Sequence, residues 1–504
     1  MIHLGIDFGT SNTVVAYELD GKFNILMFGE RAYIPSLAVK FGEEFYFGLE
    51  AEKLIPEKKA LVIHSIKQDL HDYYEGKKIE VDAERFLLRD ILAGFFRHLK
   101  GEIEKFLPVE DAEWDIITTV PANASSQQRY ITLEAMRSAG LNVRGLLNEP
   151  TASGFDFSHY FLKKSRKAKE DFNILVYDFG GGTFDVSLLR IEKNSYYVRG
   201  TLGQNNLGGN NFDKKLFSLA CAKAGINRRT LTYKQRVEGL MESRVLKESL
   251  SLSRGFLRKN IVFDFENIGI DDKLVKLESS EYFEAVKSEI NRTAELADEL
   301  MRSEAVKSRT GGIDCVDYIY LVGGSSKLPY VNHLISKLFP DTKIKIPDNS
   351  FATSALGACI YSFGKNIKLF ERFTRHFGII RLVNDREVFD PIFPKGTELI
   401  DKTRGINMVV KDYDPRFNIG HLKFIECSEI GNDKAPAGTV NLIQDIKFPY
   451  DAEVKDPENE RIIMKNLGAV TIREEYGCDA CGIISAKITR FPDGFTMGYN
   501  IAGS

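Results

Sequence analysis

The chain lacks the features that mark membrane and secreted proteins. Its 504 residues contain no apolar run of about 18 residues, the length that a membrane-spanning helix needs. The N-terminus has no basic segment followed by an apolar one, as a secretory signal would have. Six cysteines spread along the chain give no disulfide framework and fit a reducing compartment. These absences predict a cytoplasmic protein.

An excess of charge of either sign is also missing. The 68 basic and 71 acidic residues leave a formal net charge of −3, which gives no reason to expect nucleic acid or an anionic membrane as a partner. Hydrophobic residues make up 43% and charged residues 28%, as in globular proteins. Because 504 residues exceed what one hydrophobic core supports, we expect two or three domains.

One stretch, residues 175–187, has a distinctive order of apolar, acidic and glycine residues. An apolar run ends in Asp178, three glycines and Thr183 follow, and a second acid, Asp185, precedes another apolar run. This order predicts two strands joined by a tight turn, whose exposed N–H groups can face an anion such as phosphate. The two acids suit a divalent metal held through water beside that phosphate. The three glycines are Gly180, Gly181 and Gly182.

The N-terminus repeats this order. Residues 2–17 contain an apolar strand, an acid, a glycine turn with hydroxyl side chains and a second apolar strand. Two such copies predict a duplicated α/β fold whose hairpins face each other across a cleft. Two unrelated glycine turns are the alternative, but they would not explain the matched acids and threonines. The matching residues of the first copy are Asp7, Gly9, Thr10, Ser11 and Asn12.

The remaining chain separates into a mixed region and an all-β region. From Gly378 onward, short strands alternate with turn clusters and show little helical period, which predicts an all-β module. We expect an α/β domain at residues 1–365, a linker at 366–375 and a β-sandwich domain at 376–504. Helical periodicity predicts helices at residues 81–106, 125–139, 232–257, 280–303 and 351–363.

Three segments together resemble the heat shock protein 70 family of DnaK-type chaperones. Residues 6–10, 177–187 and 321–329 look like the family's three signature segments, in the family's order and at similar spacing. The stretches 119–122 and 148–152 are also similar to its nucleotide domain. The clear match ends near Lys365. The resemblance implies an actin-like two-lobe ATPase domain followed by a β-sandwich that binds a peptide or partner.

The resemblance also assigns the phosphate end of the site. It implies that Asp7 and Asp178 hold Mg²⁺ largely through water, with K⁺ as a further candidate ion. Lys67 would reach the γ-phosphate of ATP and steady the attacking water, although alone it would be interpreted as a surface lysine. Glu149 and Asp185 would orient that water or bound ions. The two phosphate turns would be formed by Gly9, Thr10, Ser11 and Asn12, and by Gly180, Gly181, Gly182 and Thr183, whose hydroxyl would lie near the γ-phosphate.

At the nucleoside end, the resemblance implies an adenosine turn, a covering helix and an acid on the far side. The turn is Gly323, Gly324, Ser325 and Lys327; the helix supplies Lys247 and Ser251; the acid is Asp348. Arg244 stands where the family usually has a glutamate that contacts the ribose. Lys327 replaces a stacking arginine, and lysine stacks less well than a planar guanidinium, so we expect weaker nucleotide affinity than the family's.

Two further departures concern partners. Gly145 stands where the family carries an arginine that contacts J-domain co-chaperones. Whether this chain depends on a J-domain co-chaperone therefore stays open, as does its dependence on a nucleotide-exchange factor. The helical lid that closes over bound peptide has no counterpart in the sequence. A groove without a lid should release peptide quickly, since affinity is mostly tuned through dissociation.

Cys478 and Cys481 allow two interpretations. Residues 479–484 look like the family's Asp-Ala-Asn-Gly hairpin, which makes Cys478-Asp-Ala-Cys481 an ordinary turn. The alternative is a four-ligand metal set with Cys427 and His421, but one Cys-x-x-Cys pair is a weak zinc signal.

Three functions follow from these observations. The first hypothesis is an ATP-dependent chaperone in which slow hydrolysis controls contact of the β-domain with unfolded or extended polypeptide. The second is an ATP-gated scaffold for one dedicated protein partner. The third, a small-molecule kinase of the same superfold, lacks an identifiable base facing a substrate pocket.

Overall fold

The structure, a computed structural model, describes residues 1–57, 59–70, 72–81, 84–107, 113–162, 171–251, 260–303, 306–307, 315–383, 386–400 and 405–501. Its contacts divide the chain into two units. Unit 1 comprises Met1–His71, Gly76–Ala122 and Ala135–Lys368, and unit 2 comprises Asp72–Glu75, Asn123–Glu134 and Leu369–Ser504. Within the described ranges, no helix is both long and apolar enough to cross a membrane.

Unit 1 is built on two sheets that share the same arrangement of five strands. Each has a central antiparallel hairpin, a third antiparallel strand on one side and two parallel strands on the other. The first sheet runs β11 (Val143–Asn148), β10 (Trp114–Val120), β1 (Ile2–Phe8), β2 (Asn12–Leu19) and β3 (Lys22–Ile25). The second runs β18 (Lys343–Lys345), β17 (Tyr318–Val322), β12 (Asp171–Phe179), β13 (Thr183–Glu192) and β14 (Ser195–Asn205). The predicted duplication of an α/β fold is therefore confirmed.

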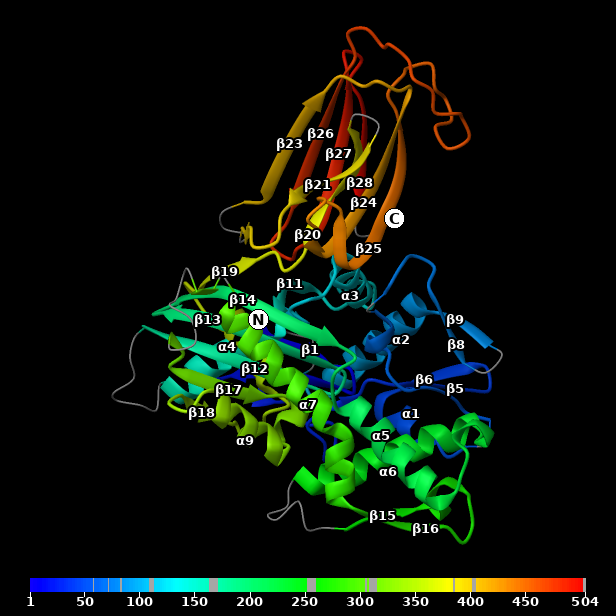
Figure 1. The fold of residues 1–504 in the computed structure, drawn as a ribbon, viewed down its shortest axis with the longest axis vertical. Helices are drawn as coiled ribbons and strands as arrows, with labels where there is room; N and C mark the ends of the chain where they lie inside the picture. The colour runs from blue at the N-terminus through cyan, green and yellow to red at the C-terminus, as the bar shows by residue number, and fades with distance from the viewer. Residues whose placement is uncertain are drawn as a thin grey trace. The chain divides into compact units, whose positions relative to one another are not determined.

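Helices cover both sheets of unit 1 (Figure 1). α10 (Thr353–Phe363) packs on β1 and β2 and against α4 (Glu149–Phe157). The second sheet has the larger apolar core, which it shares with α5 (Gly209–Ala224), α7 (Ser279–Arg302) and α9 (Pro329–Leu338). α6 (Tyr233–Ser251) packs against α5 and the small hairpin of β15 (Asn260–Asp264) and β16 (Leu274–Glu278).

One predicted helix begins later than its sequence pattern suggested. The apolar spacing of residues 81–106 predicted a single helix, but α2 runs only from Leu88 to Glu104. Residues before it form an antiparallel pair of β8 (Lys78–Val81) and β9 (Glu84–Leu87). Phe86 and Leu87 of β9 fell in the helical spacing of α2, so periodicity alone could not locate the boundary.

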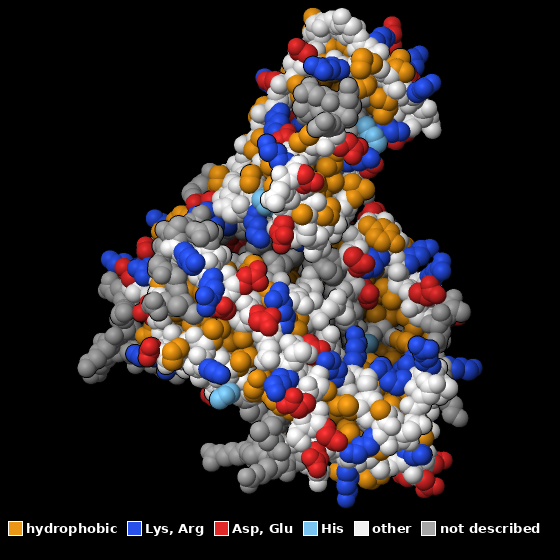
Figure 2. Space-filling view, in the orientation of Figure 1, with side chains coloured by type: hydrophobic (Ala, Val, Ile, Leu, Met, Phe, Trp, Pro, Cys, Tyr) orange, Lys and Arg blue, Asp and Glu red, His pale blue; other side chains and the backbone are white. Residues whose placement is uncertain are grey.

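Unit 2 is an antiparallel β-sandwich, as its strand pattern predicted. One sheet runs β21 (Arg386–Phe393), β20 (His376–Val383), β24 (Ile419–Ile430) and β25 (Pro436–Pro449). The other runs β23 (Asn407–Tyr413), β26 (Thr471–Cys478), β27 (Ile484–Phe491) and β28 (Phe495–Asn500). Both sheets contribute to one apolar core. On the face that Figure 2 shows, acidic and basic side chains are interspersed.

A network of charged and phenolic groups lies inside unit 2. Glu474 on β26 is fully buried, and its carboxylate receives hydrogen bonds from Arg381 on β20, Tyr413 and Tyr476 at 2.5 to 2.7 Å. Asp390 on β21 pairs in turn with Arg381 at 2.6 Å. A buried carboxylate needs such partners, because removing a charge from water without compensation is costly.

The Cys478–Cys481 segment is a hairpin turn between β26 and β27. The carboxylate of Asp479 accepts hydrogen bonds from the backbone N–H groups of Cys481 at 2.8 Å and Ile483 at 2.9 Å. His421, a member of the alternative metal set, pairs with Asp445 at 2.5 Å. Among the described residues no three His, Cys, Asp or Glu side chains come together as metal ligands, so the structure supports the turn.

Candidate functional site

The two glycine hairpins of unit 1 close in the same way. In the first, the N–H of Gly9 donates to the carbonyl of Asn12 at 3.1 Å. In the second, the N–H of Gly180 donates to the carbonyl of Thr183 at the same distance. Each turn therefore spans three residues between an outgoing and a returning strand, which leaves the tip N–H groups free to face a ligand.

The tips of the two hairpins pack against each other. A Cβ atom added to Gly182 would lie 2.6 Å from Cγ2 of Thr10, and one added to Gly181 would lie 2.5 Å from Oγ of Ser11. Real Cβ atoms do not show such distances, so a side chain at either position would force Thr10 or Ser11 to move. The hairpins thus face each other across one cleft, as their duplication predicted.

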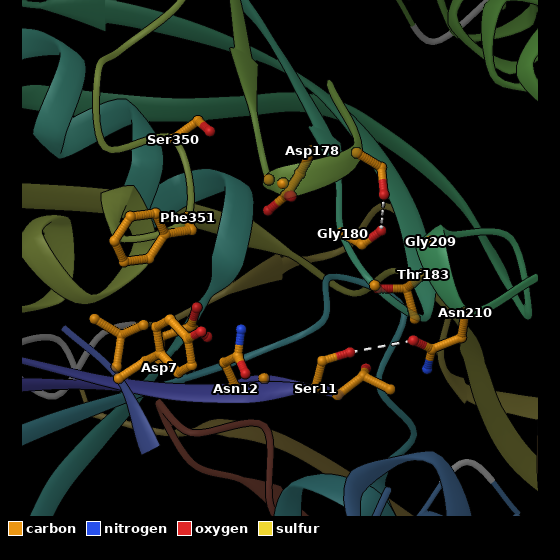
Figure 3. Close-up of a pocket in the computed structure, with 18 of the residues that line it drawn as sticks. Asp7, Ser11, Asn12, Asp178, Gly180, Thr183, Gly209, Asn210, Ser350 and Phe351 are labelled. Carbon is orange, nitrogen blue, oxygen red and sulfur yellow. Dashed lines mark hydrogen bonds between the residues drawn. The ribbon is translucent and has the colours of Figure 1, made fainter. Parts of the chain in front are cut away.

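The start of α5 joins the hairpins. The N–H groups of Gly209 and Asn210 donate to the carbonyls of Gly180 and Gly181 at 3.1 and 2.7 Å. The side-chain oxygen of Asn210 accepts a hydrogen bond from Oγ of Ser11 at 3.2 Å (Figure 3). The N-terminus of α5 therefore lies at the phosphate turns, where the helix dipole favours an anion.

Acidic side chains gather around one lysine behind the hairpin tips. Nζ of Lys67 lies 2.6 Å from Oε1 of Glu149, and both side chains are at most one tenth exposed. Asp7, at the end of β1, accepts a hydrogen bond from Oγ1 of Thr119 at 2.7 Å. Asp178 and Asp185 face each other across the ladder of the second hairpin. Figure 3 shows Asp7 and Asp178 approaching the pocket from opposite sides.

Burial dominates the electrostatics of this cluster. It raises the pKa of Asp7 to about 6 and that of Asp185 to about 8, and in both cases the charge of Glu149 adds to the effect. The pKa of Asp178 is likewise raised well above its ordinary value by burial and by its acidic neighbours. For Lys67, burial would lower the pKa, but the carboxylates of Glu149, Asp7 and Asp185 outweigh it and raise the pKa.

This donor set fits a divalent cation held mainly through water. Burial opposes ionisation of Asp7 and Asp178, and a cation between them would reverse that preference by stabilising both carboxylates. Mg²⁺ usually keeps several waters and takes one or two carboxylates together with phosphate oxygens. This coordination preference does not require three His, Cys, Asp or Glu ligands, and the described residues contain no such cluster.

The other end of the cleft is a glycine turn after β17. Gly323 adopts φ +79°, and a Cβ atom there would meet the backbone oxygen of Phe179 at 2.4 Å. Oγ of Ser325 donates to the carbonyl of Gly180 at 2.8 Å, which fixes this turn to the second hairpin (Figure 3). Nζ of Lys327 donates to the backbone carbonyl of Asp348 at 3.0 Å.

α6 supplies two cations to the cleft. Nζ of Lys247 lies 2.7 Å from Asp213 and donates to the carbonyl of Gly209 at 3.0 Å. One turn earlier, Arg244 donates from Nη2 to Oδ1 of Asn12 at 3.2 Å. Nε of Arg244 donates to Glu248 at 3.0 Å.

Most residues expected to contact the ligand line one cavity of about 340 Å³. Three expected residues lie outside the cavity wall. Gly182 lies behind the wall against Thr10, and Asp185 is buried beside Lys67. The backbone carbonyl of Asp348 accepts a hydrogen bond from Lys327. Ser251 ends α6, but its side chain lies outside the described residues. The expected residues in the wall are Asp7, Gly9, Thr10, Ser11, Asn12, Lys67, Glu149, Asp178, Gly180, Gly181, Thr183, Lys247, Gly323, Gly324, Ser325 and Lys327.

The cavity also has wall residues that sequence reasoning missed. Tyr33 and Phe351 come from distant parts of unit 1, and their rings meet edge to face at 6.3 Å between centroids. Neither lies in a motif, so no local signal could have found them. Gly209 and Asn210 begin α5 within a glycine-rich stretch, whose sequence did carry a phosphate-turn signal.

Comparisons with known proteins agree with this geometry. A model of the family described as "Hsp70 protein" matches residues 3–365. Proteins named "Chaperone protein DnaK" from Thermotoga petrophila and Thermotoga maritima are each 29% identical over 432 residues, which cover 81% of this chain and 68% of theirs. The family match spans both sheets of unit 1, both hairpins and the glycine turn at Gly323. The chain therefore belongs to the Hsp70 family, with an actin-like two-lobe ATPase fold followed by a β-sandwich.

Proposed function

We propose that this chain is an ATP-dependent molecular chaperone of the DnaK type. It binds ATP with Mg²⁺ in the cleft of unit 1 and hydrolyses it slowly. The nucleotide state then controls the contact of the β-sandwich with unfolded or extended polypeptide. The observation that carries the proposal is the pairing of two glycine hairpins, tip to tip, around the buried Lys67–Glu149 pair and the acids beside it.

The residues of the cleft have separate tasks in hydrolysis. The hairpin N–H groups hold the phosphates, and Lys67, fixed by Glu149, donates to the terminal phosphate and to the attacking water. The oxygen of that water bonds to the terminal phosphorus as the bond to the bridging oxygen breaks, which yields ADP and inorganic phosphate. Glu149 and Asp185 orient the water, and the carboxylate of Glu149 accepts the proton that the water loses. Bound Mg²⁺ neutralises the charge of the triphosphate.

The sandwich offers apolar surface for polypeptide. β23 is at the edge of its sheet in the described strand order; Met408 and Val410 on it, and Ile406 just before it, occupy alternate positions of the chain. Ile406, Met408 and Val410 are 52%, 50% and 52% exposed. An exposed edge with apolar side chains suits an extended chain that adds as a strand.

The division of the chain into units supports coupling between the nucleotide state and the β-sandwich. Residues 123–134 lie within the stretch that matches the family model, yet their contacts group them with the sandwich. There, the backbone N–H of Ser126 donates to the buried carboxylate of Glu426 at 3.2 Å. The first turns of α3 (Ser126–Ser138) are therefore part of unit 2 and its last turn is part of unit 1.

Single-turnover hydrolysis of ATP, with Mg²⁺ present and absent, tests the enzymatic part of the proposal. We expect slow release of phosphate that requires the metal. Limited proteolysis of the sandwich with ATP, with ADP and without nucleotide tests the coupling, and identical cleavage in all three states would contradict it. Peptide arrays then test the partner: binding to many apolar peptides supports the chaperone, and binding to one sequence supports a scaffold for a dedicated partner.

A further inference from the structure

Arg244 touches the first phosphate hairpin from the opposite side of the cleft. It comes from α6, which packs on the second half of unit 1, yet its Nη2 donates to Oδ1 of Asn12, three residues after Gly9. Lys247, one turn further along the same helix, contacts Gly209 beside the second hairpin. One face of α6 therefore reaches both phosphate turns, through Arg244 to the first and through Lys247 to the second.

The hydrogen bond from Arg244 fixes the orientation of the Asn12 amide. Because a guanidinium can only donate, the atom of Asn12 that faces it must be the carbonyl oxygen. The amide nitrogen of Asn12 then points into the pocket, as Figure 3 shows. Without Arg244, nothing among the described hydrogen bonds of the Asn12 side chain would hold that nitrogen toward the ligand.

The guanidinium is itself held rigidly. Its Nε donates to Glu248 at 3.0 Å, one helical turn further along α6, and the Arg244 side chain is only 24% exposed. Arg244 also stands in the wall between the nucleotide cleft and a second cavity of about 460 Å³. A bound nucleotide would therefore lie against this side chain.

We infer that Arg244 is a positioning residue of the nucleotide site. It orients the Asn12 amide so that its nitrogen donates to a bound nucleoside polyphosphate, and it ties α6 to the first hairpin so that the nucleotide leaves slowly. This inference rests on the proposed function, because it requires that the cleft binds a nucleotide. The sequence showed only that Arg244 departs from the family's usual glutamate. It did not indicate this positioning role.

The test is a double-mutant cycle on the full-length chain. Dissociation of radiolabelled ADP is followed by filter binding, in Mg²⁺ and excess unlabelled ADP, for wild type, Arg244→Ala, Asn12→Ala and the double variant. Loss of a hydrogen bond to a charged group predicts release about 10- to 100-fold faster in Arg244→Ala. If Arg244 acts through Asn12, the double variant releases ADP no more than about threefold faster than the faster single variant.

Exchanging the charges of residues 244 and 248 separates the effect of Arg244 on nucleotide release from its effect on the stability of α6. Arg244→Glu with Glu248→Arg restores an ion pair four residues apart on α6, in an orientation that favours the helix. We expect this double variant to keep the thermal stability of wild type but not its slow release. Arg302→Ala, which breaks a similar pair with Asp298 on α7, should leave release unchanged.

Each outcome decides between the inference and its alternatives. Unchanged release in Arg244→Ala, or recovery of slow release in the charge exchange, would overturn the inference. Multiplicative effects of the two alanine substitutions would show that Arg244 acts independently of Asn12 and would overturn it as well. If wild type binds no ADP or ATP at all, the proposed function fails instead.

Discussion

Nζ of Lys67 lies 2.6 Å from Oε1 of Glu149 in a part of unit 1 where both side chains are almost completely buried. The lysine comes from the short helical turn Lys67–Leu70, and the glutamate begins α4. Each therefore fixes the other, and the ammonium group has one defined position beside Asp7 and Asp185. Such preorganisation is what electrostatic catalysis of phosphoryl transfer requires.

Lys67→Met should slow hydrolysis and spare binding. The ammonium acts on the terminal phosphate and the water, so we expect single-turnover hydrolysis to fall by about 100-fold or more. The affinity for ATP, measured by calorimetry, should change far less. Lys105→Ala, which removes a lysine from an exposed pair with Glu102, is the matched control. Equal hydrolysis by wild type and Lys67→Met would remove Lys67 from the mechanism.

Gly182→Ala should weaken nucleotide binding. The added Cβ atom would lie 2.6 Å from Cγ2 of Thr10, so the hairpin tips would have to separate. Overpacking of this kind costs about 1–3 kcal/mol, and we expect the dissociation constant for ATP to rise about tenfold. Gly101→Ala meets no atom within 4 Å of its new Cβ and serves as the control. Tight binding by Gly182→Ala would show that the tips need not touch.

Asp156 should make the stability of unit 1 depend on pH. Burial raises the pKa of its carboxyl from 3.8 to about 7, although Tyr320 donates a hydrogen bond to it at 2.6 Å. Between these values the folded protein holds a proton that the unfolded chain has lost. Stability should therefore be highest near pH 4 and fall as the pH rises toward 7, by up to about 4 kcal/mol.

Asp156→Asn isolates this contribution. Urea unfolding can be followed through Trp114, the only tryptophan in the sequence, at several pH values from 4.5 to 7.5. The stability of wild type relative to Asp156→Asn should decrease steadily over that range. Asp90→Asn, which replaces an exposed carboxylate on α2, should show the same pH dependence of stability as wild type. Parallel curves for Asp156→Asn would show that its carboxyl does not change protonation on unfolding.

Arg381→Met should loosen unit 2. It would leave the buried carboxylate of Glu474 without its cation, and breaking such a pair costs about 3–5 kcal/mol. Hydrogen exchange measured by mass spectrometry should then show faster exchange in β20 and β26. Arg473→Met, which breaks an exposed pair with Asp412, should cost less than about 1 kcal/mol. Unchanged exchange in Arg381→Met would mean that the network contributes little to stability.

The sequence revealed the parts of the site whose residues are neighbours in the chain. Both hairpins were predictable because glycine, acids and hydroxyls stand at fixed offsets around each turn. Tyr33 and Phe351 were not, since tertiary packing alone brings them to the cleft. The partner of Lys67 could not be read from spacing either, because 82 positions separate it from Glu149.

The interior of unit 2 shows the same limit. Short strands between turn clusters indicated an all-β module, but that pattern gives no sign that a charged residue lies in its core. Glu474 nevertheless lies there, because Arg381, Tyr413 and Tyr476 satisfy its carboxylate inside the core. Arg381 on β20 and Tyr413 on β23 are far from Glu474 in sequence, so only the folded chain identifies them as its partners.

Isothermal titration calorimetry of ATP into the full-length chain, with Mg²⁺ present, tests the central claim most directly. Two opposed hairpins that form one cleft predict a single site per chain, with affinity that falls when Mg²⁺ is removed. Absence of any saturable heat with ATP or ADP in the presence of Mg²⁺ would contradict the claim.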